Sequence, residues 1–216
     1  MQMGEIEIST PIPEEAIRRL KAGDHVYLSG VIITARDAAH KRIIHYIREG
    51  RDLPFSLKGS ALYHCGPIVK RLNGEWRILA AGPTTSMRME PFEAELVRMG
   101  VKVIIGKGGM GDRTRDSLRR YGSVYCSFTG GAAALAAKHI ESVVDVKWLD
   151  LGMPEAVWIL RVKRFGPLIV GMDSHGRSLY EEVRSEAMRN LEEILKHLSE
   201  RSENTPSNLR MRISRQ

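Results

Sequence analysis

The sequence predicts an α/β domain built on one mixed sheet and followed by a flexible C-terminal tail. Strands alternate with helices through the middle of the chain, and three strands then follow one another near its end. Neither an internal repeat nor an interior linker interrupts this pattern. We therefore expect one domain over residues 1–200 and a basic, disordered tail over residues 201–216, which is rich in Ser, Asn and Arg.

The first quarter of the chain predicts two strands and two helices. Alternation of apolar and polar side chains indicates the first strand, which two prolines end, and β-branched and aromatic residues indicate the second. Amphipathic segments that follow each strand favour helices. These criteria give a strand over residues 4–10, a helix over 14–22, a strand over 25–34, a helix over 35–48 and a loop over 52–58.

The middle of the chain alternates more regularly. Cys65-Gly66-Pro67 predicts a turn within or beside a strand in residues 61–69. Four of the five residues 101–105 are β-branched, which indicates a short buried strand. A glycine-rich loop follows at residues 106–111. The remaining elements expected here are strands over 76–81 and 123–126 and helices over 89–99, 112–121 and 131–140.

The last part of the domain predicts three successive strands, over residues 143–149, 156–162 and 168–173. A long helix, charged on one face, is expected over residues 179–198.

Composition excludes several classes of protein. Of 216 residues, 43% are hydrophobic and 27% charged, which is typical of a soluble globular protein. No apolar run approaches the roughly 18 residues that cross a bilayer, and the N-terminus lacks the apolar core of a signal peptide. Two cysteines are too few for a disulfide framework or for an iron–sulfur cluster. These features predict a cytoplasmic protein without a membrane role.

Of the net charge of +7, about +3 comes from residues 201–216, which hold four arginines and one glutamate, and the rest is spread along the body of the chain. A basic balance could indicate nucleic-acid binding. The sequence has no arginine-rich helix, no RNA-binding aromatic motif and no zinc-finger spacing. We therefore predict no primary nucleic-acid role.

The glycine-rich loop Gly106-Lys107-Gly108-Gly109-Met110-Gly111 lies between a predicted strand and a predicted helix. Such a loop lets backbone N–H groups approach an anion at the positive end of the helix. It matches neither a Walker A loop nor G-x-G-x-x-G. An anion-binding loop and a plain tight turn with a solvated Lys107 are the two interpretations.

Three cations lie at three successive strand-to-helix junctions: Arg36, Arg88 and Lys107. A cation at the positive N-terminus of a helix is unfavourable, and an anionic ligand would offset that cost. Open α/β sheets bind ligands at the carboxyl ends of their strands. Guanidinium groups grip carboxylates bidentately, so the three cations suit a dicarboxylate.

The segment GPTTSMRME places hydroxyl groups directly before Arg88. One interpretation is an active-site loop in which Thr84 faces a ligand. The other is turn chemistry, in which Thr85 and Ser86 cap the following helix, as Thr34 would cap the helix over 35–48.

Three motifs carry a resemblance when they are read together and in order. They are TARDAAH at residues 34–40, GPTTSMRM at 82–89 and GKGGMG at 106–111, joined by GMPEA at 152–156 and DSHG at 173–176. The chain resembles the β subunit of class I iron–sulfur fumarate hydratases, the C-terminal domain of their single-chain form and the β subunit of L-tartrate dehydratase. The resemblance covers the whole body up to about residue 200.

The resemblance implies a hydro-lyase that interconverts fumarate and malate and is active only with an α subunit. Three cysteines of that α subunit would hold the [4Fe-4S] cluster, so this chain would bind no metal. A swivelling β/β/α domain would close over the cluster. By motif, Arg36, Arg88 and Lys107 would bind the substrate carboxylates and Thr84 would be the base. The supporting residues would be Asp37, His40, Thr85, Gly106, Gly108 and Gly109.

Several alternatives stay open. A threonine hydroxyl is a weak base, so Thr84 could hydrogen-bond the substrate while another group takes the proton. His40 could orient Asp37 or Arg36, or be a partly buried helix residue. His64 and Cys65 lack a second ligand pair, which argues against a metal there. Tartrate is the alternative substrate, an autonomous anion- or nucleotide-binding protein is a further one, and the isolated chain could form a homodimer. Asp173 and His175 flank a turn and are expected to be structural.

Overall fold

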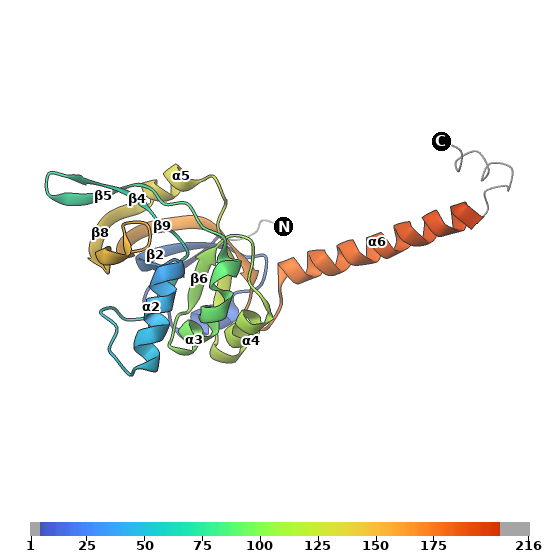
Figure 1. Ribbon diagram of the computed structural model, residues 1–216, viewed down its shortest axis with the longest axis horizontal. Helices are drawn as coiled ribbons and strands as arrows, with labels where there is room; N and C mark the ends of the chain where they lie inside the picture. The colour runs from blue at the N-terminus through green and yellow to red at the C-terminus, as the bar shows by residue number, and fades with distance from the viewer. Residues whose placement is uncertain (1–4, 204–216) are drawn as a thin grey trace. The chain divides into compact units, whose positions relative to one another are not determined.

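The computed structural model describes residues 5–203 of the chain (Figure 1). The chain divides into two compact units, with the boundary between Leu179 and Tyr180. The helix α6 (Leu179–Glu203) belongs to the second unit from Tyr180 onward; it begins where the long helix is predicted and continues past residue 198. Most of the predicted disordered tail, residues 204–216, lies outside the described residues.

A seven-stranded mixed sheet forms the centre of the first unit, in the order β1-β2-β3-β6-β7-β9-β8. Strands β1, β2, β3, β6 and β7 are parallel to one another, whereas β9 is antiparallel to β2, β7 and β8. The mixed sheet is therefore confirmed. The strands are β1 (Ile6–Ser9), β2 (His25–Thr34), β3 (Ala61–Tyr63), β6 (Val103–Gly106), β7 (Val124–Ser127), β8 (Ile140–Lys147) and β9 (Val157–Met172).

The sheet closes on itself. From β2, the hydrogen-bonded neighbours run through β3, β6, β7 and β9, and β9 pairs with β2 again. These five strands form a ring whose interior must be filled by side chains. The aromatic rings of Tyr63 and Phe128 lie 5.3 Å and 5.2 Å from that of Phe165, and all three residues are buried.

The prediction of two separate strands over 156–162 and 168–173 is wrong, because β9 is one continuous strand. Gly166-Pro167 lies between the two predicted strands, and proline cannot donate to a sheet ladder. The register instead shifts at this point: Phe165 pairs with Leu28, and Leu168 pairs with Val26. A bulge therefore accommodates the proline without ending the strand.

Helices cover the sheet on both sides. Figure 1 shows α2, α3 and α4 side by side on one side, and α5 with the β4–β5 hairpin on the other. In the region of this hairpin's first strand, the sequence predicts a strand only within residues 61–69, whereas the structure has a separate strand β4 that continues to Leu72. The bounds are α1 (Glu14–Arg19), α2 (Asp37–Arg48), α3 (Glu90–Arg98), α4 (Asp112–Tyr121), α5 (Ala133–Lys138), β4 (Ile68–Leu72), β5 (Glu75–Ala80) and the 3₁₀ turns η1 (Ser86–Met89) and η2 (Leu149–Leu151).

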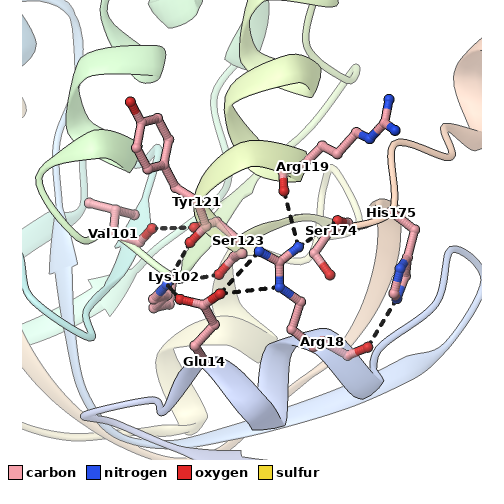
Figure 2. Close-up of polar contacts among 10 residues, drawn as sticks. Glu14, Arg18, Val101, Lys102, Arg119, Tyr121, Ser123, Ser174 and His175 are labelled. Carbon is pink, nitrogen blue, oxygen red and sulfur yellow. Dashed lines mark hydrogen bonds and ion pairs between the residues drawn. The ribbon is translucent and has the colours of Figure 1, made fainter.

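A cluster of polar contacts fastens α1 to α4 at the amino ends of β6 and β7 (Figure 2). The Lys102 ammonium donates to the last carbonyls of α4 and lies 3.2 Å from Glu14. Arg18 bonds the same carboxylate and a carbonyl of α4, and His175 bonds the Arg18 carbonyl. Asp173 accepts three main-chain N–H bonds. The contacts of His175 and Asp173 are of the structural kind that was expected.

Within residues 5–203, no helix is both long enough and apolar enough to cross a membrane.

Candidate functional site

The three predicted cationic segments meet at one edge of the sheet. Strands β2, β3 and β6 are parallel neighbours, so their carboxyl ends lie side by side. Arg36 follows β2 and Lys107 follows β6. The loop that carries Thr84 crosses between them: the Thr84 N–H donates to the His64 carbonyl at 2.7 Å and the Ser86 N–H to the Lys107 carbonyl at 3.0 Å. Residues far apart in sequence thus share this carboxyl edge.

Arg88 is held by two groups at once. Its Nη2 donates to Asp37 Oδ2 at 2.9 Å and to Thr84 Oγ1 at 2.9 Å. The side chains of Arg88 and Asp37 are 44% and 36% exposed, so a solute can reach them. The remaining guanidinium nitrogens of Arg88 form no hydrogen bond within the described residues. Because a guanidinium has five donors, it can hold Thr84 and still grip a carboxylate.

Arg36 is fixed by a second carboxylate. Its Nε lies 3.3 Å from Glu155 Oε1, while Glu155 Oε2 accepts a 2.8 Å bond from the Ala38 N–H. Glu155 therefore caps the first turn of α2, and the interpretation of Thr34 as that cap is wrong. The Thr34 hydroxyl accepts from the Trp158 N–H instead. Arg36 Nε is buried and has no hydrogen-bond partner in the described part of the chain.

The Arg36 side chain lies directly over Gly66. A Cβ at this position would come within 2.7 Å of Arg36 Cδ and 2.5 Å of the Pro154 carbonyl oxygen. Only glycine leaves room for this approach. The turn at residues 65–67 and the GMPEA segment therefore together form the surface against which the Arg36 side chain packs.

Lys107 is exposed, and its ammonium makes no hydrogen bond or ion pair within residues 5–203. It stands at the start of a loop whose left-handed backbone needs glycine, with φ of 83° at Gly108 and 74° at Gly109. The nearest loop across from it holds Gly130, where a Cβ would lie 4.0 Å from Lys107 Nζ. Lys107 is thus a cation available to an anionic ligand.

A side-chain carboxylate already occupies the N-terminus of α4. Glu90 accepts from the Gly111 N–H at 2.8 Å, from the Thr114 N–H at 3.1 Å and from the Thr114 hydroxyl at 2.7 Å. An external phosphate would have to displace this carboxylate from the positive end of the helix. The glycine-rich loop therefore does not favour the nucleotide-binding alternative.

Gly106, the last residue of β6, makes room for a neighbouring hydroxyl. A Cβ here would lie 1.9 Å from Ser86 Oγ and 3.1 Å from His64 Nδ1. Glycine at position 106 therefore lets the Ser86 side chain approach the strand closely, whereas Gly108 and Gly109 allow the left-handed backbone of the loop.

Beneath the loop lies a buried polar chain of five side chains. The Nε2 atoms of His40 and His64 lie 2.8 Å and 2.7 Å from the same oxygen, Glu93 Oε1. His64 Nδ1 lies 2.9 Å from Ser86 Oγ, and that oxygen accepts a 3.0 Å bond from the Tyr125 hydroxyl. Both histidines and Glu93 are completely buried.

The surroundings shift the pKa values of this buried chain in a consistent way. Burial lowers the pKa of His64, although Glu93 opposes this effect. Burial would raise the pKa of Glu93, but the two histidines outweigh it and lower the pKa to about 2. Glu93 is therefore a carboxylate at neutral pH.

The structure shows the contacts of three residues whose roles the sequence left open. His40 is fully buried, and its Nδ1 lies 2.8 Å from the Arg36 carbonyl oxygen. Neither Thr85 nor Ser86 caps a helix with its side chain. Thr85 is exposed and pairs only through its backbone with Lys107.

Sequence reasoning missed the roles of Glu93, His64, Ser86 and Glu155. One signal was present: Glu93 lies three and four positions before Leu96 and Val97, on the apolar face of α3. A charged residue on a buried face needs partners, and here the partners His40 and His64 lie 53 and 29 residues earlier in the sequence. Which histidines would meet Glu93 was not readable from spacing.

The two cysteines offer poor metal ligands. Cys65 and Cys126 are both free and buried. Burial raises the pKa of each thiol to about 12, and Arg36 only partly opposes this at Cys65. Metal binding needs thiolates, so these residues do not fit an iron–sulfur cluster.

Comparison with known proteins gives matches over most of the chain. Residues 1–183 match the family model described as fumarase C-terminus. The L(+)-tartrate dehydratase subunit beta of Escherichia coli (strain K12) is 44% identical over 176 residues, 81% of this chain and 86% of that protein.

Two further relatives differ in length. A putative L(+)-tartrate dehydratase subunit beta of Methanocaldococcus jannaschii is 47% identical over 186 residues, 85% of this chain and 95% of that protein. A putative fumarate hydratase class I of Geobacillus stearothermophilus is 45% identical over 191 residues, which cover 88% of this chain but 36% of that protein.

Proposed function

Because this chain belongs to the fumarase C-terminus family, we propose that it is the β subunit of a two-subunit hydro-lyase that hydrates fumarate reversibly to malate. The observation that supports the proposal is that the segments carrying Arg36, Arg88 and Lys107 lie at one carboxyl edge of the sheet, where Arg88 also bonds the Thr84 hydroxyl. The relatives are named as a tartrate dehydratase and a fumarate hydratase, and both reactions add or remove water at a dicarboxylate.

The cations bind the two carboxylates of the substrate. Arg88 enters the reaction already oriented by Asp37, so less side-chain freedom is lost on binding. Arg36 is oriented by Glu155 and by the packing of its side chain against Gly66. Lys107 supplies a third positive charge from the glycine-rich loop. Fixed cations in a cleft also raise the rate at which a dianion arrives.

Thr84 stands next to the carbon that gains or loses a proton. Its oxygen accepts the Arg88 bond, so the hydroxyl proton is free to point toward the substrate. The guanidinium also stabilises a threonine alkoxide, which makes proton abstraction by this weak base feasible. Thr84 holds or moves the proton, and Arg88 places the hydroxyl.

The reaction requires a partner. The cysteines of this chain do not fit a [4Fe-4S] cluster, so we assign the cluster to an α subunit that bears the necessary cysteines. The length of the fumarate hydratase relative supports this division, since this chain corresponds to 36% of it. The β subunit would close over the α subunit by a swivelling motion, in the cytoplasm, and its association with a second copy of itself stays a prediction.

L-tartrate is the second candidate substrate, favoured by the names of two relatives. Tartrate carries a hydroxyl on each central carbon, whereas malate carries one. Groups that accept from or donate to the second hydroxyl would decide between them, and the cations of this chain suit both.

The test is anaerobic co-expression with a cysteine-bearing α subunit from the same genome, followed by assays on fumarate, malate and L-tartrate. Turnover of fumarate and malate supports the main assignment, and turnover of tartrate alone supports the second. A complex that carries an intact cluster but turns over none of the three substrates overturns both.

A further inference from the structure

We propose that Glu93 is a positioning residue: it bridges a charged His40 and a neutral His64 and so holds the Arg36 segment and the Thr84–Arg88 loop in fixed relation. The consequence for catalysis rests on the proposed function. The hydrogen-bond arrangement itself is a property of this chain alone and can be tested without any enzymatic assay.

Proton counting gives the charge of His40. Its Nδ1 lies 2.8 Å from the Arg36 carbonyl oxygen, which can only accept, so Nδ1 carries a proton. Its Nε2 lies 2.8 Å from Glu93 Oε1. Because Glu93 is a carboxylate, Nε2 must also carry a proton. His40 is therefore an imidazolium that forms a buried ion pair with Glu93.

The other ring needs no second proton. His64 Nε2 donates to the same Glu93 oxygen. Its Nδ1 faces Ser86, whose hydroxyl can donate to it, while the Ser86 oxygen accepts from Tyr125. His64 is thus neutral, with its proton on Nε2. In this arrangement each donor meets one acceptor, from Tyr125 through to the Arg36 carbonyl.

Both ends of this chain of bonds touch the substrate-binding segments. His40 fixes the carbonyl of Arg36 itself. His64 fixes the other segment twice, since its carbonyl accepts from the Thr84 N–H and its ring holds Ser86. Both rings depend on one oxygen of Glu93, because Glu93 Oε2 has no hydrogen-bond partner in the described part of the chain. Loss of the Glu93 charge should therefore release both segments together.

A purely stabilising role accounts poorly for this arrangement. A buried ion pair contributes little net stability relative to well-packed apolar side chains, because both charges lose their hydration. It does impose one geometry on the groups it joins.

The same three side chains could also surround a metal ion, since their ligand atoms lie within 4.8 Å of one another. A metal would require unprotonated Nε2 atoms, the opposite of the proposed arrangement.

The first experiment uses the full chain alone, labelled with ¹⁵N at histidine. Ring NMR should show protons on both nitrogens of His40 and only on Nε2 of His64 at pH 7. In Glu93→Gln, which keeps the shape and removes the charge, His40 should lose one ring proton. A neutral His40 in the unmodified chain, or about one equivalent of bound divalent metal by elemental analysis, overturns the proposal.

The second experiment separates positioning from general destabilisation. Ser117→Ala is the matched control. The Ser117 hydroxyl, on α4, donates to the Ala94 carbonyl of α3, the helix that carries Glu93, and Ser117 is not part of the network. Hydrogen exchange of the Thr84 and Ser86 amides should accelerate at least about tenfold in Glu93→Gln, relative to amides of β9, which contributes no side chain to the network, and stay unchanged in Ser117→Ala. Equal acceleration at β9 would mean that Glu93 only stabilises the fold, and would overturn the positioning role.

The third experiment uses the reconstituted complex. Misplaced binding groups should lower kcat/KM by about 10- to 100-fold in Glu93→Gln, with less than a threefold change in Ser117→Ala. Unchanged kcat/KM in Glu93→Gln overturns the positioning role even if the hydro-lyase assignment stands. An inactive unmodified complex overturns the assignment and, with it, the catalytic consequence, whereas the ring protonation and the amide exchange still decide whether Glu93 holds the two segments.

Discussion

Arg88 Nη2 bonds the Thr84 hydroxyl and the Asp37 carboxylate at the same distance, 2.9 Å. This nitrogen of Arg88, the proposed carboxylate-binding residue, thus joins the proposed base Thr84 to Asp37, the first residue of α2. The three residues will not behave independently when they are changed, and the variants below are designed with this in view.

In the reconstituted complex, Thr84→Val should mainly lower kcat. Removal of a proton-transfer group costs about 10²–10⁴ in rate, and valine keeps the shape of threonine without its hydroxyl. Thr85→Ala is the control, because Thr85 is exposed and its side chain caps no helix. Steady-state kinetics should be measured with the cluster content checked in each variant. A near-normal kcat in Thr84→Val would show that the hydroxyl is not the base.

Arg88→Ala should mainly weaken substrate binding. Loss of a hydrogen bond to a charged group costs about 1.5–3 kcal/mol, which corresponds to roughly 10- to 150-fold in kcat/KM. Arg98→Ala, which removes an exposed arginine whose only ion pair among residues 5–203 is with Glu95 one helical turn away, should change kcat/KM by less than twofold. A fall in kcat at saturating substrate with unchanged KM would place Arg88 in the chemical step instead.

Gly106→Ala should destabilise the domain by about 1–3 kcal/mol, the usual cost of overpacking. The new methyl group would collide with Ser86 Oγ, 1.9 Å away. Chemical denaturation measures the loss. The double variant Gly106→Ala/Ser86→Ala should recover part of it, because the colliding oxygen is gone. No recovery would mean that the cost comes from the strand backbone and not from Ser86.

The stability of the domain should fall on the acid side of neutral pH. The lowered pKa of His64 means that the unfolded chain binds a proton there first, so stability is lost as the pH falls below about 6.5. The lowered pKa of Glu93, which faces His40 and His64, adds a second loss between about pH 4.5 and its folded value of about 2. Urea unfolding at stepped pH should show that Glu93→Gln lacks the second loss. Parallel curves for the two proteins would contradict this assignment.

The chain purified alone under anaerobic conditions should contain no iron–sulfur cluster and should not dehydrate malate. Its two cysteines are buried and protonated, and a cluster needs several thiolates. Iron and sulfide analysis with a malate assay is the measurement. Stoichiometric iron and sulfide, or turnover without a partner, would contradict the division of labour between the two subunits.

The sequence predicted a mixed sheet and the positions of two cations on it, but not the continuity of its last strand. Arg36 and Lys107 could be placed at one edge because each follows a strand, and parallel strands share their carboxyl ends. The continuity of β9 could not be predicted, since a bulge that accommodates Gly166-Pro167 depends on the register with β2.

The hydrogen-bonded side chains buried beneath the loop could also not be predicted from the sequence. His40, His64 and Glu93 come from α2, from the end of β3 and from α3. Only the packing of α2 and α3 against the sheet brings them onto one oxygen. A histidine read alone has too many structural roles for its spacing to decide between them.

The closed ring of strands has a consequence for synthesis on the ribosome. The strand that completes the ring, β9 (Val157–Met172), is the last to emerge, and it pairs with β2, which emerges near the start. Until then β2 and β7 each present an unpaired edge to other nascent chains. Pairing between such distant segments is slow, so this protein should depend on holding chaperones late in translation, and fragments that end before residue 157 should aggregate.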